Sequence, residues 1–157
     1  YTLADILNDK CETLDIRGVA HKGFFASITD FPSYYAANMA LLNYKSAQEL
    51  FHENWPIYTR TNDSCPTQYF NTADVKNSVI SNGCQIEGTV ENSVIGRGCV
   101  IKKGAVVRNS VVLAEVTVGE GVHVENEVVD KWANLIHKKE IVSPAEQPGY
   151  IRRNDTL

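Results

Sequence analysis

The chain has 157 residues, 43% of them hydrophobic, which suffices for one sizeable core or for one compact domain with a docked appendage. Its net charge of -4 at pH 7 and its lack of any Lys or Arg run argue against a nucleic-acid partner, because binding a phosphate backbone requires a basic field. No apolar stretch approaches the roughly 20 residues that cross a bilayer. Residues 1–10 lack the layout of a signal peptide, so we expect a cytoplasmic protein without membrane contact.

Helix signals dominate the first part of the chain. Asp30 is a suitable N-cap and Pro32 falls in the first turn, where a missing N–H costs nothing, so the pattern predicts a helix over residues 31–42. Tyr35, Met39 and Leu42 recur at helical spacing on one face. Such a stripe is typical of core packing.

A second, shorter helix is predicted over residues 46–50, where Ser46 and Glu49 have the spacing of a capping box. From residue 53 to residue 70, prolines and small polar residues replace any regular period. We therefore expect an extended linker there.

The rest of the chain is repetitive. The motif Asn-Ser-Val-Ile and its variants occur four times, 15, 17 and 17 residues apart, at residues 77–80, 92–95, 109–112 and 126–129. Within each copy an aliphatic residue recurs about every sixth position, and glycines fall between these positions. This is the hexapeptide signature of a parallel β-helix.

The spacing of the repeats indicates how each coil is built. Three six-residue sides would need about 18 residues, so repeats of 15 to 17 residues imply a shortened corner. Coils stack about 4.8 Å apart, which should place Cys84 beneath Cys99 as small buried residues. All four cysteines, including Cys11 and Cys65, lack the spacing of a zinc or redox motif, and we expect free thiols.

We expect a left-handed β-helix, the usual hand of this class. About four coils are predicted over residues 75–129, with a further strand at 140–142 and a tail through Pro144 and Pro148. An open end coil exposes strand edges that need a cap or a partner, so oligomerisation is expected.

Motifs of catalysis are absent from this sequence. It has no P-loop, no G-x-G-x-x-G and no G-x-S-x-G, and we predict no catalytic residue. His123 within a coil and His137 after the last repeat leave one alternative open, a hexapeptide acyltransferase in which a histidine is the general base. Neither histidine lies in a motif, and a place on the surface or packed at an edge is favoured for both.

Basic residues recur along the repeats and could form an anion site for a phosphorylated effector if several converge. Their alternative role is to solvate the exterior of the β-helix, balanced by neighbouring glutamates. The residues concerned are Arg97, Lys102, Lys103, Arg108, Lys131, Lys138, Lys139, Arg152 and Arg153.

Five stretches, in order along the chain, carry a family resemblance. They are GFFASI at 23–28, SYYAANMALL at 33–42, WPIYT at 55–59, NSVIGRG at 92–98 and VVDK at 128–131. On these the chain resembles the C-terminal third of a glucose-1-phosphate adenylyltransferase (ADP-glucose pyrophosphorylase) subunit. The resemblance implies that residues 1–30 are the trailing edge of a truncated nucleotidyltransferase domain, residues 31–70 linker helices and an extended connection, and residues 71–157 the β-helix domain.

The resemblance also implies what this chain lacks. The family's nucleotidyltransferase domain makes ADP-glucose from ATP and glucose 1-phosphate with magnesium, and we expect no cofactor in this part. Catalytic members end that domain with Y-W-x-D-x-G-T, where the Asp lies near metal and sugar nucleotide; Ser27 stands at that position here. A hydroxyl is a poorer ligand than a carboxylate for a hard divalent cation. We therefore expect the regulatory, non-catalytic type of subunit of bacterial glycogen biosynthesis, whose partner is a catalytic subunit.

Lys131 matches a lysine that some family members use to bind phosphorylated activators. It is the effector-binding candidate, and the alternative is a lysine that flanks a turn. Three hypotheses follow for the chain: a regulatory and assembly module, an acyltransferase, or a structural oligomerisation element that binds no ligand.

Overall fold

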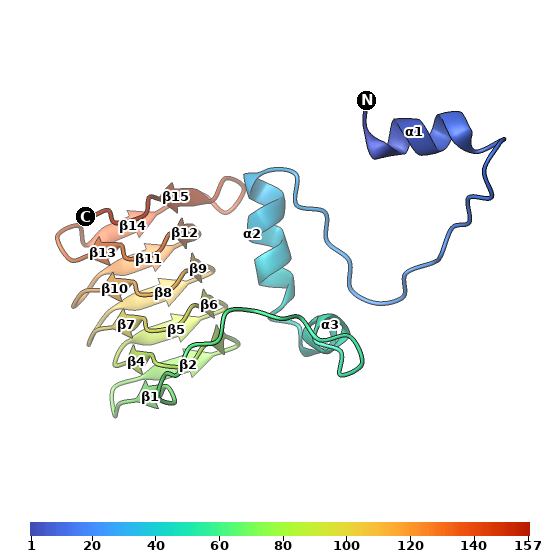
Figure 1. The fold of residues 1–157 in the computed structure, drawn as a ribbon. Coiled ribbons are helices and arrows are strands. Elements are labelled where there is room, and N and C mark those ends of the chain that lie inside the picture. Colours follow the sequence, from blue (N-terminus) through green and yellow to red (C-terminus); the bar gives the residue numbers. More distant parts are fainter.

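The computed structural model describes residues 1–157, and most of its regular structure is a β-solenoid in the second half of the chain (Figure 1). Three helices precede the solenoid: α1 (Leu3–Lys10), α2 (Phe31–Ala40) and α3 (Tyr44–Leu50). None of them is long and apolar enough to span a bilayer.

Fifteen short strands form three parallel sheets of five, and each sheet takes every third strand along the chain. Sheet A contains β1 (Gln68–Tyr69), β4 (Gln85–Ile86), β7 (Val100–Ile101), β10 (Thr117–Val118) and β13 (Asn134–Leu135). Sheet B contains β2 (Asp74–Lys76), β5 (Thr89–Glu91), β8 (Val106–Arg108), β11 (His123–Glu125) and β14 (Glu140–Val142). Sheet C contains β3 (Val79–Ile80), β6 (Val94–Ile95), β9 (Val111–Val112), β12 (Glu127–Val129) and β15 (Gly149–Ile151).

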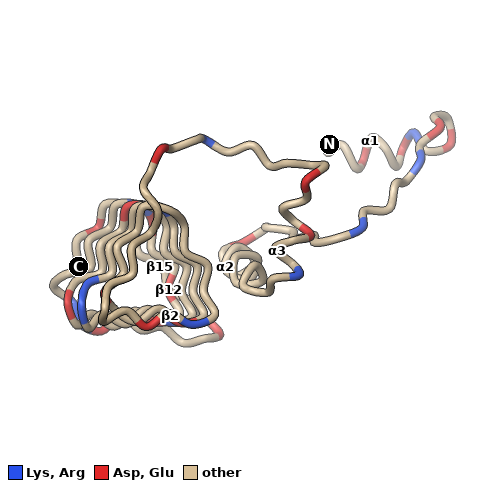
Figure 2. The backbone as a smooth tube through the Cα atoms, turned by 90° about the horizontal axis from the view of Figure 1, so that it is seen from below, with Lys and Arg blue, Asp and Glu red and all other residues tan.

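The view along the solenoid shows the three sheets as the sides of a triangular prism (Figure 2). The predicted parallel β-helix with hexapeptide repeats is thereby confirmed, and the strand expected at residues 140–142 is β14. The solenoid also extends beyond the predicted coils at both ends. Strand β1 pairs with β4 where a linker was expected, and β15 pairs with β12 where a tail was expected.

One inward aliphatic side chain from each strand after β1 fills the axis of the prism. In sheet B the inward column runs through Val75, Val90, Val107, Val124 and Ile141, and the last four are at most 5% exposed. Those four belong to a cluster of 18 buried side chains that runs through the solenoid, and the partly buried Val75 packs against it. The six-residue period of the sequence is therefore the period of the core.

Cys84 and Cys99 both lie buried in this core, each preceding paired strands of sheet A, as predicted. Their thiols donate to the carbonyl oxygens of Gly96, at 3.1 Å, and Leu113, at 3.0 Å. Burial of this kind is typical of structural cysteines rather than reactive ones. Cys11 and Cys65 are exposed, and no cysteine is in a disulfide.

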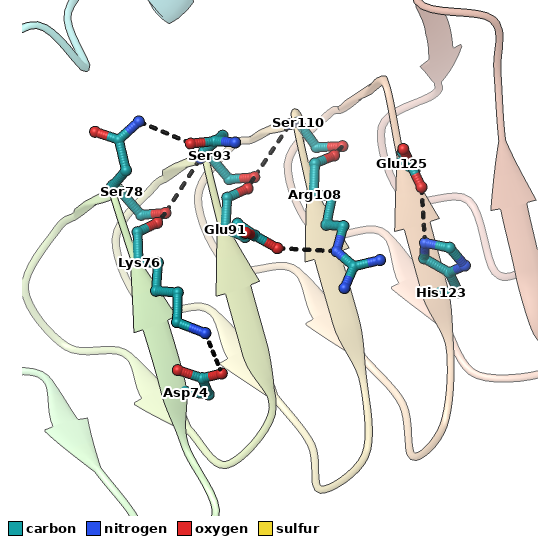
Figure 3. Close-up of polar contacts among 11 residues, drawn as sticks. Asp74, Lys76, Ser78, Glu91, Ser93, Arg108, Ser110, His123 and Glu125 are labelled. Atoms are coloured by element: carbon teal, nitrogen blue, oxygen red, sulfur yellow. Dashed lines mark hydrogen bonds and ion pairs between the residues drawn. The ribbon is translucent and has the colours of Figure 1, made fainter.

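The Asn-Ser pair of the first three repeats, and Asn126-Glu127 in the fourth, form the corner between sheets B and C. The asparagines at 77, 92, 109 and 126 all adopt positive φ, between 42° and 57°. Each following serine accepts the backbone N–H one coil above, as Ser78 does from Ser93 at 3.2 Å and Ser93 does from Ser110 at 3.1 Å (Figure 3). This tight turn is a shortened corner of the kind that the repeat length predicts.

Helix α2 confirms the first predicted helix, although it ends at Ala40, two residues early. The Asp30 side chain accepts the Ser33 N–H at 2.8 Å, and Pro32 lies in the first turn. The helix lies alongside sheet C (Figures 1 and 2) and contacts β9. The stripe of Tyr35, Met39 and Leu42 is half-buried, so it packs at the surface of the solenoid and not in its core.

The capping of the second helix was predicted wrongly. Helix α3 begins at Tyr44, and its N-cap is Asn43, whose side chain accepts the N–H groups of Lys45 and Ser46. Ser46 is inside the helix and makes no capping box with Glu49. Asparagine is a strong N-cap in its own right, and it lies three residues before the expected one.

Candidate anion-binding cleft

A cleft of about 480 Å³ lies at the corner that joins sheet C to sheet A. Three stacked turns and Arg153, two residues after β15, supply one wall, and the linker that precedes β1 supplies the other. The lining residues are Arg60, Thr61, Asn62, Arg97, Ala114, Glu115, Lys131, Trp132 and Arg153. Segments more than 90 residues apart in the sequence thus meet at one place.

Four of the lining side chains are cationic: Arg60, Arg97, Lys131 and Arg153. None of them takes part in any of the five ion pairs of the protein. Glu115 is the one carboxylate of the cleft, and it forms no ion pair either. Four unpaired cations around one cleft repel one another, and an anion between them relieves that repulsion.

Hydrogen bonds hold both walls of the cleft. Arg97 Nη1 donates to the Arg60 carbonyl oxygen at 2.9 Å, which fastens the linker to the solenoid. Asp130 accepts the Lys131 N–H at 2.7 Å and the Tyr150 hydroxyl at 2.8 Å. The backbone bond to Lys131 chiefly, and then the bond to Tyr150, hold the pKa of Asp130 below its usual range. Asp130 is thus engaged with backbone and hydroxyl, and the Lys131 ammonium stays unpaired.

The backbone of this corner takes the left-handed conformation in every coil. The five residues with positive φ here are Gly83, Gly98, Glu115, Trp132 and Asn154. Glycine and asparagine favour this conformation, but glutamate and tryptophan rarely adopt it. Both exceptions, Glu115 at φ 62° and Trp132 at φ 59°, line the cleft.

Of the basic residues that the sequence singled out, the structure brings Arg97, Lys131 and Arg153 together in the cleft. The others lie outside it: Arg108 pairs with Glu91 at 3.0 Å (Figure 3), and Lys102 pairs with Glu87 at 3.7 Å. Those outside are Lys102, Lys103, Arg108, Lys138, Lys139 and Arg152. Sequence reasoning missed Arg60, which comes from an aperiodic linker without any motif.

The two histidines lie apart from the cleft. His123 is on the outward side of β11, and its Nε2 lies 3.0 Å from the Glu125 carboxylate (Figure 3). His137 is exposed after β13, and its backbone N–H donates to the Leu157 carbonyl oxygen at 2.6 Å. The structure does not bring them into one site.

Ser27 lies exposed in the irregular segment between α1 and α2. Its neighbours Ala26 and Ile28 line a different cleft of about 690 Å³, which is mostly apolar and includes Phe24, Phe25 and Leu41. No three His, Cys, Asp or Glu side chains in the protein gather in a way that would hold a metal ion. Because magnesium needs oxygen ligands, chiefly carboxylates, the residues around Ser27 do not fit a magnesium site.

Comparison with known proteins places this geometry in context. The chain is 31% identical to the glycogen biosynthesis protein GlgD of Bacillus subtilis over 152 residues, which cover 97% of this chain and 44% of the relative. It is 37% identical to the glucose-1-phosphate adenylyltransferase of Fervidobacterium nodosum over 108 residues, or 69% of this chain and 26% of the relative. It is 37% identical to GlgD of Geobacillus stearothermophilus over 107 residues, which cover 68% of this chain and 31% of the relative.

The chain thus spans less than half the length of each of these relatives. The resemblance to the glucose-1-phosphate adenylyltransferase family, first drawn from five short stretches, is confirmed. The family model described as "GlmU-like, C-terminal hexapeptide" matches residues 66–147, which contain most of the strands of all three sheets. With more than half of its length matched and the solenoid that such repeats build, the chain belongs to the GlmU-like C-terminal hexapeptide family.

Proposed function

We propose that the chain is the C-terminal regulatory and assembly part of an ADP-glucose pyrophosphorylase subunit in bacterial glycogen biosynthesis. The alignment to a protein named for glycogen biosynthesis covers 97% of the chain, which includes the helices and the linker as well as the repeats. That coverage supports a shared arrangement of both halves. The subunit is of the non-catalytic type, because Ser27 stands where the family's catalytic members have a carboxylate.

The observation that carries the regulatory role is the cleft's set of four cations, Lys131 among them, none of which is in an ion pair. A phosphate group bears about −1.5 to −2 charges near pH 7 and offers several strong acceptors. Arginine binds it through two parallel N–H donors, and lysine binds it as a point charge. A phosphorylated effector is therefore the class of ligand that this cleft suits.

The two-walled construction of the cleft suggests how an effector would act. Residues 60–62 belong to the linker that leads from the helices to β1, whereas Lys131 and Arg153 belong to the solenoid. An anion bound to both walls ties the linker to the solenoid. Regulation follows only if the effector prefers one of two arrangements, since the coupling equals its difference in affinity.

Exposed apolar side chains in the first 58 residues support a role in assembly. Val19 is 94% exposed, Tyr58 90%, Phe25 78% and Trp55 75%. Isolated exposed apolar residues are ordinary, but this many in one region mark a contact surface. The partner we propose is a catalytic subunit, and magnesium and ATP would bind its nucleotidyltransferase domain and not the residues described here.

The test is co-expression of the natural protein that carries this chain with its catalytic partner. We expect a changed rate of ADP-glucose synthesis or a changed response to sugar phosphates. Lys131→Ala should abolish the response and leave co-purification intact, whereas Lys103→Ala, an exposed lysine outside the cleft, should do neither. If the catalytic subunit has the same rate and the same effector response with and without the protein that carries this chain, the regulatory proposal is refuted.

The acyltransferase hypothesis has a separate test. It requires acyl-CoA binding near His123 or His137, neither of which lines the cationic cleft. Acetyl-CoA itself carries phosphate groups that suit the cleft, so variants are needed to separate the two functions. In a regulatory module Lys131→Ala abolishes calorimetric binding of acetyl-CoA and His123→Ala does not, whereas an acyltransferase binds acetyl-CoA without Lys131 and loses acetyl transfer in His123→Ala or His137→Ala.

A further inference from the structure

Trp132 occupies a corner position that suits it poorly. Its φ is 59°, and the stacked positions in three other coils hold Gly83, Gly98 and Asn154, the residue types that tolerate this conformation. For a bulky residue a positive φ is an outlier that the surrounding structure must hold in place. Packing does not demand the ring either, because Trp132 is 44% exposed.

The contact that the indole does make is with Arg153. The guanidinium carbon lies 4.2 Å from the centre of the Trp132 ring, a cation–π arrangement for which tryptophan is the best partner. The Arg153 side chain forms no ion pair and donates no hydrogen bond within the chain. The ring is therefore what holds an otherwise free, exposed guanidinium.

Trp132 also follows Lys131 directly, and all three residues line the same cleft. An arginine binds phosphate best when its planar fork is already aimed, because less side-chain freedom is then lost on binding. A guanidinium fixed by the ring beside Lys131 combines two donor types at one place. The Glu115 carboxylate within the cleft makes such aiming more important, since a free guanidinium could swing toward it.

We propose that Trp132 is a positioning residue of the anion site: its ring pre-orients Arg153 so that Arg153 and Lys131 bind one phosphate or pyrophosphate group together. This inference rests on the proposed effector function and names the group that the cleft takes. Trp132 both strains the backbone of the corner and orients the Arg153 guanidinium. A substitution that relieves the strain also releases the arginine, so stability and binding should respond differently.

Replacing Trp132 by glycine should move stability and binding in opposite directions. Glycine adopts the left-handed corner freely, so the melting temperature of Trp132→Gly should equal or exceed that of the unmodified chain. The same change releases Arg153 and should weaken anion binding about two- to fivefold, the range of an exposed cation–π contact. A tryptophan with a merely structural role would show the reverse pattern, a lower melting temperature with unchanged affinity.

The experiment is calorimetric titration of the full chain with inorganic pyrophosphate at fixed ionic strength. Trp132→Phe should retain most of the affinity, because phenylalanine keeps an aromatic face. Asn109→Gly is the matched control, since it places glycine at a left-handed residue of the other corner, away from Arg153 and the cleft, and its affinity should be unchanged. The double variant Trp132→Gly/Arg153→Ala should bind no more weakly than Arg153→Ala alone, because the ring acts through the arginine.

Two results would overturn the inference, and they are distinguishable from failure of the proposed function. If Trp132→Gly binds pyrophosphate as well as the unmodified chain, or if the losses from Trp132→Gly and Arg153→Ala multiply, the ring does not position the arginine. If the unmodified chain binds no pyrophosphate and Lys131→Ala changes nothing, the anion site itself is refuted, and the positioning role falls with it.

Discussion

Asparagine opens each repeat because the corner between sheets B and C turns through the left-handed region. At the third such corner Asn109 has φ 44°, and its side chain makes no hydrogen bond, so its contribution there is conformational. Most L-residues pay about 1–2 kcal/mol for this backbone, whereas glycine and asparagine adopt it readily. The asparagine that opens each repeat is therefore there because the corner backbone needs a residue that tolerates a positive φ.

We predict that Asn109→Ala lowers the free energy of unfolding by about 1 kcal/mol, while Asn109→Gly changes it by no more than a few tenths. The comparison isolates the backbone, because both variants lose the same side-chain atoms beyond Cβ. Urea denaturation of the two variants measures it. Equal destabilisation by alanine and glycine would show that the amide group, and not the positive φ, matters.

Glu127 is the buried exception in the serine ladder. It takes the place that Ser78, Ser93 and Ser110 hold in the coils below, it is 4% exposed, and its Oε1 accepts the Ser143 hydroxyl at 2.5 Å. Burial raises the pKa of Glu127, against the smaller opposing effect of that hydrogen bond. The space above is kept by Gly149, where a Cβ would lie 2.1 Å from the carboxylate.

Because the pKa of Glu127 is raised in the folded state, the free energy of unfolding depends on pH in a definite direction. The folded protein holds the Glu127 proton to higher pH than the unfolded chain, so the stabilisation is complete below the unfolded value of about 4.3 and is lost as pH rises through the folded value. We predict that Glu127→Gln is more stable than the unmodified chain at pH 8 and that the difference shrinks toward pH 4. Thermal unfolding between these limits measures it, and a difference independent of pH would contradict the assignment.

At the scale of elements, sheet C differs from the others because both of its faces are apolar. Its outward column contains Val79, Val94, Val111 and Val128, and the last two are at most 1% exposed. Helix α2 lies along this face, with Phe31 against Tyr150 at 5.9 Å between ring centres. An outward apolar column is therefore the reason that a helix docks on this side of the solenoid.

The docking of α2 includes one hydrogen bond that can be removed cleanly. The Tyr35 hydroxyl donates to the Asn109 carbonyl oxygen at 2.5 Å, and burial raises the pKa of Tyr35 further above its ordinary value. We predict that Tyr35→Phe destabilises the protein by about 1 kcal/mol and speeds proteolysis before residue 31. Tyr34→Phe is the control, because its hydroxyl makes no hydrogen bond, and equal effects of the two variants would exclude a role for the bond.

What the sequence could predict at this scale depended on repetition. Residues such as Ile95, Ile101 and Val107 recur at six-residue steps because each fills one side of the prism, so the strands and the core followed from spacing. Strand β1 escaped prediction because its inward position holds Tyr69, which is 54% exposed, in place of a buried aliphatic. The register of an end coil is set by its neighbour, and no local pattern marks it.

The cleft was predictable only in part, for a similar reason. Lys131 stood out by its family motif, and Arg97 lay in a repeat corner. Arg60 reaches the cleft through a bond to a residue 37 positions further along the chain. The placement of an aperiodic linker is decided by tertiary contacts, which no periodicity encodes.

At the scale of the whole molecule, the two ends of the solenoid differ in whether the chain covers the terminal coil. The chain's last residues fold over the final coil: the N–H groups of Asn134, Ile136 and His137 donate to the carbonyl oxygens of Asp155 and Leu157, and Leu157 packs against the core. At the other end β1, β2 and β3 have no strand below them. Capping of terminal coils is a general need of solenoids, because an open coil exposes edges and core.

We predict that removing residues 154–157 speeds amide hydrogen exchange at Asn134, Ile136 and His137 by about tenfold or more, the loss of roughly 1.4 kcal/mol of local protection. Amides of β4 and β7 should be little affected, because each coil contacts only its neighbours. Exchange followed by mass spectrometry measures both regions. Uniform acceleration along the solenoid would show that its coils unfold as a single unit.

The in-register stacking of the coils also restricts which insertions and deletions such a chain can accept during evolution. A single residue gained or lost within a strand would turn all later inward side chains toward water, so shortening or lengthening is tolerated only as an entire circuit of three sides or as a bulge at a vertex. The steps of 15 and 17 residues between the asparagines show both circuit lengths in one molecule. The prism can therefore become taller or shorter only by whole circuits. A ligand site at one vertex then keeps its position relative to the circuits directly above and below it.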